Sequence, residues 1–94
     1  MLRIEALEID DHVLEKIESK HGISFSEVEE ACLSEGRHVR RDREGLYKVF
    51  SQTGAGRHVL VVVANLGGGH WRTVTAREMT ASERRLYVRE TGGR

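Results

Sequence analysis

The chain has 94 residues, 38% hydrophobic and 32% charged, which fits a single soluble domain with a modest core and argues against two domains. One cysteine rules out an intrachain disulfide and a cysteine-based zinc site, and no apolar run approaches the about 20 residues of a membrane helix. The 15 basic and 15 acidic side chains cancel overall, yet residues 1–35 carry a net charge of −7 and residues 36–94 one of +7. The opening residues lack the pattern of a secretory leader, so we expect a cytoplasmic protein.

The first third of the chain predicts a short strand followed by two helices. Residues 3–9 alternate loosely and indicate a strand at a sheet edge. Asp10 or Asp11 can cap a helix that ends at Gly22, because glycine readily adopts the left-handed conformation of a helix end.

The second helix begins where Ser24 and Glu27 have the spacing of a capping box, and we expect it to end at Gly36. Its apolar stripe contains Cys32, which we interpret as a core residue rather than a nucleophile. The buried faces of the two helices are predicted to consist of Val13, Leu14, Ile17, Phe25, Val28, Ala31 and Cys32.

The middle of the chain reads as strands joined by glycine-rich turns. Residues 38–42 form a short edge strand or a loop, and residues 46–52 form a strand. Residues 58–64 are almost all apolar, which favours a central strand buried on both faces. In residues 70–76 strict alternation places Trp71, Thr73 and Thr75 on one face. The three glycines at 67–69 indicate a hairpin turn rather than a phosphate-binding loop, because no helix follows them.

The last segment predicts a helix from a second capping box, Thr80 with Glu83, to about Arg89. Leu86 is its clearest apolar anchor, and residues 91–94 are expected to be a disordered tail. Arg77 precedes the positive end of this helix, which is mildly unfavourable. Either a functional need or an offsetting carboxylate, Glu78 or Glu83, explains it, and without other information the carboxylate is the simpler interpretation.

These elements predict one α+β domain over residues 1–94, with two helices covering one face of the sheet. The basic segment, in which eleven of twelve cations are arginine, suits RNA or an acidic protein, although the two halves could simply neutralise each other. The five histidines are scattered, and their spacing does not favour a metal site.

Three stretches of the chain resemble the BrnT-like proteins. Residues 20–28 resemble that family's KHGVSFEEA-type segment, and residues 56–63 resemble its GRxLVVV strand. Residues 75–80 with 83–87 resemble its SARxxTxxERRxY ending. All three occur in the family's order and spacing, over roughly residues 4–89.

The resemblance implies a RelE-like α+β fold: an N-terminal strand and two helices packed on a three- to four-stranded antiparallel sheet, with a C-terminal helix. It also implies the toxin of a type II toxin–antitoxin module, a metal-independent endoribonuclease without a cofactor. Its expected partners are RNA and a BrnA-type antitoxin with a ribbon-helix-helix domain. The alternatives are a non-catalytic RNA- or protein-binding module of the same fold, or a regulatory subunit that binds an acidic partner.

The matched positions supply the candidate site residues. Lys20, His21 and Arg77 are the catalytic candidates, since imidazole can serve as base or acid near neutral pH and arginine pairs with phosphate. The RNA-binding candidates are Arg57, Arg72, Arg84 and Tyr87. Arg57 could instead only flank the hairpin turn, Tyr87 could only pack the last helix on the sheet, and His21 could only cap a terminal carbonyl.

Overall fold

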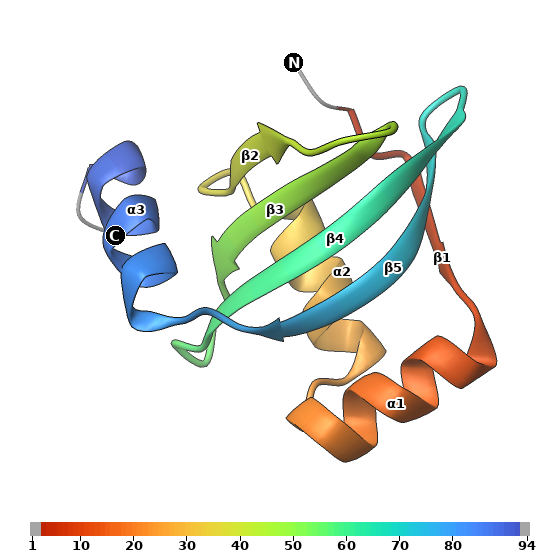
Figure 1. Cartoon of the computed structure of the whole chain (residues 1–94), viewed down its shortest axis with the longest axis horizontal. Helices are drawn as coiled ribbons and strands as arrows, with labels where there is room; N and C mark the ends of the chain where they lie inside the picture. The colour runs from red at the N-terminus through yellow and green to blue at the C-terminus, as the bar shows by residue number, and fades with distance from the viewer. Residues whose placement is uncertain (1–2, 93–94) are drawn as a thin grey trace.

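One five-stranded sheet and three helices make up the part of the chain that the computed structural model describes, residues 3–92 (Figure 1). In chain order the elements are β1 (Ala6–Ile9), α1 (Asp11–His21), α2 (Phe25–Leu33), β2 (His38–Arg41), β3 (Leu46–Gln52), β4 (His58–Gly67), β5 (His70–Glu78) and α3 (Ala81–Thr91). The fold is α+β, as predicted, and the strand order is β1-β5-β4-β3-β2. β4 is therefore the central strand, as its apolar run predicts.

The sheet differs from the expected three- to four-stranded antiparallel one, because it has five strands and is mixed. β2, β3, β4 and β5 pair antiparallel, but β1 pairs parallel with β5. β1 leads directly into α1 and cannot form a hairpin with a neighbour, so it joins the sheet edge that β5 leaves open. The Glu5 and Ala6 amides donate to the Gly69 carbonyl, and the Trp71 indole donates to the Arg3 carbonyl.

The helix ends follow the local signals in the sequence with one exception. Asp10 caps α1, and Gly22 ends it with φ of 62°. The capping boxes of α2 and α3 both form. The exception is the end of α2, which lies at Leu33 with Ser34 as the C-cap, two residues before the expected Gly36. Of the expected tail, Thr91 is the last residue of α3 and Gly92 caps it, while 93–94 lie outside the described residues.

The main core lies between the sheet and the pair α1 and α2, which cover one sheet face as predicted. Figure 1 shows α2 crossing behind β3, β4 and β5. The helices contribute to this core Ile17, Val28, Ala31 and Cys32, and β3 and β4 contribute Val49, Val59, Val61 and Val63. Cys32 is fully buried, and that burial raises the pKa of its thiol to about 12, which fits a packing role.

A smaller core lies on the opposite sheet face, under α3. Phe50, Leu60, Met79 and Tyr87 form it, with Leu86 packed at its margin. The buried anchor of α3 is therefore Tyr87, not Leu86, because Tyr87 faces the sheet beside His58 with the rings in edge contact. α3 covers only one end of this face, so Val62 is only half-buried and β4 is not covered on both faces along its whole length.

A β-bulge in β5 changes the alternation expected for residues 70–76. The register with β4 shifts between Val62 and Val63, which pair with Thr75 and Thr73. Thr73 is buried on the face of the main core, whereas Thr75 is exposed beside Val62 on the other face. The prediction that Thr75 shares a face with Trp71 and Thr73 is wrong, because the extra residue, Val74, reverses the alternation.

Candidate active site

A shallow hollow of about 390 Å³ lies where α1 ends beside the junction of β5 and α3. Lys20 and His21 come from the last turn of α1, and Arg77 and Glu78 come from the end of β5. Thr80, the N-cap of α3, completes the lining. The three residues predicted to be catalytic thus face one space, although Arg77 is more than fifty positions from Lys20 and His21 in the chain.

Local backbone signals position these side chains. Gly22 stops α1 directly after His21, and its amide donates to the Glu18 carbonyl at 3.0 Å. Lys20 and His21 therefore stand exposed at a helix C-terminus, where cations are favoured. Thr80 turns the chain out of the sheet and starts α3, which holds Arg77 at the mouth of the hollow.

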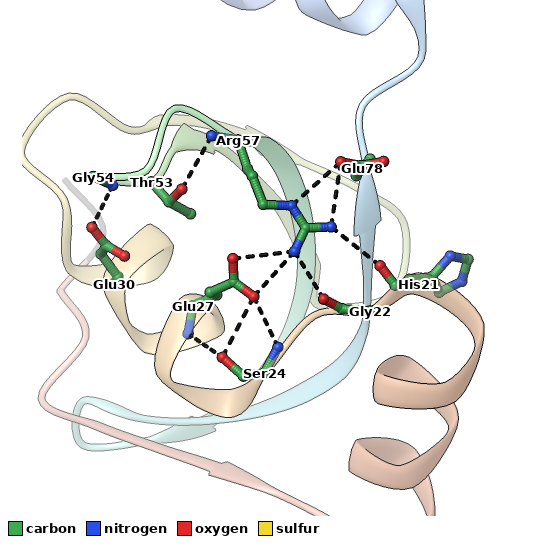
Figure 2. Close-up of polar contacts among 9 residues, drawn as sticks. All are labelled: His21, Gly22, Ser24, Glu27, Glu30, Thr53, Gly54, Arg57 and Glu78. Atoms are coloured by element: carbon green, nitrogen blue, oxygen red, sulfur yellow. Dashed lines mark hydrogen bonds and ion pairs between the residues drawn. The ribbon is translucent and has the colours of Figure 1, made fainter.

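Arg57 forms an internal clamp behind the hollow (Figure 2). Its guanidinium donates to the Gly22 carbonyl at 2.8 Å and to the His21 carbonyl at 3.2 Å. It also pairs with Glu27 at 3.2 Å and with Glu78 at 3.3 Å. One side chain, from the residue directly before β4, thereby connects the end of α1, the start of α2 and the end of β5.

The positive charge of Arg57 is compensated by the carboxylates beside it. Burial opposes the charge on Arg57, but hydrogen bonds and charge from Glu27 and Glu78 outweigh it and raise the pKa of the guanidinium. The Ser24 amide, together with Arg57, lowers the pKa of Glu27 despite the opposing effect of burial. Its donors are engaged by intramolecular acceptors that hold the turn at residues 21–22, so contact between Arg57 and RNA would require the guanidinium to exchange a partner.

Arg77 is also paired within the chain. Its guanidinium forms a bidentate pair with Glu83, with hydrogen bonds of 2.7 Å and 2.9 Å. Glu83 accepts as well from the Thr80 amide, as the third residue of the α3 capping box. The Arg77 hydrogen bonds lower the pKa of Glu83 to about 2 although burial opposes this. The Arg77 side chain is 38% exposed, so it is reachable from solvent.

The other predicted RNA-binding residues lie away from the hollow. Arg72 is exposed on β5, 3.5 Å from Glu8 of β1. Arg84 is exposed on α3. Tyr87 is only 2% exposed and its hydroxyl donates to the Gly36 carbonyl at 3.3 Å, so its ring cannot stack on a base without α3 moving.

Three acidic or hydroxyl residues at the site were not among the predicted site residues: Glu78, Thr80 and Glu83. The sequence contains a signal for them, since Arg77 lies just before a helix start that has Glu at its third position. The simpler interpretation of that pattern, an offsetting carboxylate, is the geometry found. Within residues 3–92 no group of three His, Cys, Asp or Glu side chains is placed to hold a metal ion. The same residues contain no helix long and apolar enough to cross a membrane.

The comparisons with known proteins identify the fold. No protein-family model matches the chain, and no curated protein matches it either. Among solved structures it is similar to the ribonuclease toxin BrnT of Brucella abortus, with a TM-score of 0.66 and 13% sequence identity. The match covers 85% of this chain and 99% of that one. The protein therefore has the BrnT-like toxin fold, which is the fold that its three sequence motifs imply.

Proposed function

We propose that this protein is the toxin of a type II toxin–antitoxin module and cleaves RNA without a metal ion. The observation that carries the proposal is the gathering of Lys20, His21 and Arg77 around one hollow. The likeness to a ribonuclease toxin supports it at the level of the fold. We further propose a cytoplasmic location and, as partners, RNA and a ribbon-helix-helix antitoxin of the BrnA type.

The hollow contains the residue types that this reaction needs. A base must take the proton of the RNA 2′-hydroxyl, so that the 2′-oxygen attacks phosphorus and the bond to the 5′-oxygen breaks. His21 is the candidate base. Lys20 supplies positive charge and a proton for the departing 5′-oxygen, and Arg77 binds the phosphate whose negative charge grows in the transition state.

In this proposal the phosphate competes with Glu83 for Arg77. The bidentate pair occupies the edge of the guanidinium that would hold a phosphate equally well. Glu83 therefore holds Arg77 at the hollow when RNA is absent. When RNA binds, one or both of the Arg77–Glu83 hydrogen bonds break, and the phosphate takes the place of the carboxylate.

The test is cleavage of a mixed-sequence RNA in EDTA, with and without ribosomes. Arg77→Ala should lower the rate about ten- to hundredfold, as expected for loss of a charge-assisted contact in the transition state. Arg85→Ala, an exposed arginine on the neighbouring helix, should leave the rate unchanged.

His21→Ala and Lys20→Ala have matched controls on the same helix, His12→Ala and Lys16→Ala, which are also exposed. Circular dichroism of each variant separates loss of chemistry from loss of folding. A folded wild-type protein that leaves RNA intact in both conditions would refute the enzymatic proposal, and cleavage abolished by EDTA would refute its metal independence.

One observation favours the alternative, a non-catalytic RNA- or protein-binding module. Arg57 and Arg77, the two arginines nearest the hollow, are already paired with carboxylates. In that case RNA would bind without being cut, and binding would depend on the exposed Arg72 and Arg84. RNA retention by the intact protein, lost in Arg84→Ala but not in Arg77→Ala, would favour this alternative.

A further inference from the structure

A second, larger hollow lies far from the candidate active site, beside the edge strand β2. It measures about 860 Å³ and lies between the C-terminal end of α2 and the sheet. Its apolar lining comes from Leu33, Val39 and Tyr47. Its polar lining consists of two basic residues, Arg37 and Arg41, one acidic residue, Glu35, and Ser34. Leu33 is 56% exposed, the highest value among the exposed large apolar residues described. We call this hollow the β2 groove.

The backbone of β2 offers hydrogen-bonding groups beside the groove. β2 is at the end of the strand order, so only β3 pairs with it. The Asp42 amide donates to the Leu46 carbonyl at the start of the β3 ladder. Because hydrogen-bonded pairs alternate in antiparallel sheets, Arg40 and His38 also bond toward β3, whereas Val39 and Arg41 direct their amides and carbonyls outward.

The side chains of the same two residues face the groove. Val39 is opposite the buried Val49 and Arg41 is opposite Tyr47, so both lie on the face that α2 covers. The Arg41 guanidinium lies 5.8 Å from the centre of the Tyr47 ring and donates to its hydroxyl at 3.4 Å. No carboxylate of residues 3–92 forms an ion pair with Arg41.

Charge distinguishes between the possible occupants. A second copy of the chain, paired antiparallel through its own β2, would bring Arg40 and Arg41 of both copies together. Like charges facing each other across strands are destabilising, so self-pairing is disfavoured. A strand with carboxylates on its groove side would meet Arg41 favourably.

We propose that the β2 groove binds an extended acidic segment of a partner protein, which adds to the sheet as a strand beside β2. Its backbone pairs with the outward amides and carbonyls of Val39 and Arg41. On the groove side, an apolar side chain contacts Leu33 and Val39, and a carboxylate reaches Arg41. This surface is separate from the hollow at Lys20, so the proposal does not depend on RNA cleavage.

The test uses an acetylated peptide of about ten residues in which Glu and Val occupy every second position in turn and Thr fills the positions between them, so that one face carries both Glu and Val. A matched peptide has Lys in place of Glu. Binding is followed by fluorescence anisotropy at physiological salt, where charges beyond about 8 Å are largely screened. Only the acidic peptide should bind. Arg41→Glu should weaken it about tenfold or more, whereas Arg40→Glu, on the same strand but the opposite face, should change it by less than about threefold.

Two further measurements test the geometry. Leu33→Ser should weaken binding, whereas Leu66→Ser, at another exposed leucine, on β4, should not. In amide hydrogen exchange of the whole chain, the peptide should protect Val39 and Arg41, while the Arg40 amide is slow both with and without it.

Several outcomes would overturn the proposal: no binding of the acidic peptide, equal effects of Arg41→Glu and Arg40→Glu, or binding without protection of Val39 and Arg41. A dimer of the wild-type chain in sedimentation that Arg41→Glu dissociates would also overturn it, by assigning the groove to a second copy.

Discussion

Two regions of this molecule hold arginine in opposite ways. At the junction of α1, α2 and β5, Arg57 and Arg77 are bound to Glu27, Glu78 and Glu83. On the outer face of α3, Arg84 and Arg85 are exposed, and neither forms an ion pair with a carboxylate of residues 3–92.

The difference shows that a count of cations does not locate a binding surface. An arginine whose guanidinium already donates to carbonyls and carboxylates holds segments of the fold together. It can bind a ligand only by exchanging one of these partners. Arginine without such partners presents its whole charge to solvent. The junction thus combines structural and candidate catalytic roles, whereas the α3 face can contribute only surface charge.

The largest expected effect comes from removing the clamp. Arg57→Ala should lower the free energy of unfolding by about 2–3 kcal/mol, because it removes the guanidinium that donates to the Gly22 and His21 carbonyls and pairs with two carboxylates. Urea denaturation measures this change. Arg84→Ala is the matched control and should cost no more than about 0.5 kcal/mol. Equal costs for the two variants would erase the proposed distinction between the regions.

The next effect is an acid dependence of stability at the Arg77–Glu83 pair. Glu83 has a folded-state pKa of about 2, below its ordinary value of 4.5, so its stabilisation is present above about pH 5 and is lost as the pH falls toward 2. With Glu83 20% and Arg77 38% exposed, solvent screening limits this loss to about 1–2 kcal/mol.

Thermal unfolding between pH 6 and pH 2, in the wild type and in Glu83→Gln, checks this dependence. The variant should be less stable at pH 6 and should lose less stability on acidification. Protonation of Glu27, whose pKa is also lowered, accounts for part of the acid destabilisation that the variant still shows. Parallel pH profiles of the two proteins would show that the pair does not contribute.

The smallest effect concerns the charge of the α3 face. Burial, and then the positive charge of Arg84, lower the pKa of His58 below its ordinary value. Arg84→Gln should therefore raise the His58 pKa without restoring its ordinary value, because burial remains. An NMR titration of the imidazole in both proteins measures the shift. Arg85→Gln serves as the control, and an unchanged His58 pKa in Arg84→Gln would contradict the unpaired state of Arg84.

The features that could be predicted from the amino-acid sequence are mainly local. The caps at Asp10, Ser24 and Thr80 and the left-handed stop at Gly22 involve residues only a few positions apart, so spacing alone predicts them. The position of β4 in the middle of the sheet follows from its apolar run, because such a run must be buried. The three family-like motifs also predicted the BrnT-like fold that the solved-structure comparison shows.

Features that depend on residues far apart in the chain could be found only in the folded structure. The parallel pairing of β1 with β5 joins segments more than sixty positions apart. The bulge that turns Thr75 outward depends on the register with β4, which the alternation within β5 does not contain. Arg57 and Arg84 look alike in the sequence, and only the folded chain places carbonyls and carboxylates around the first and solvent around the second. Local hydrogen bonds and periodicity can be predicted from neighbouring residues, whereas the pairing of a charge depends on every element that the fold brings beside it.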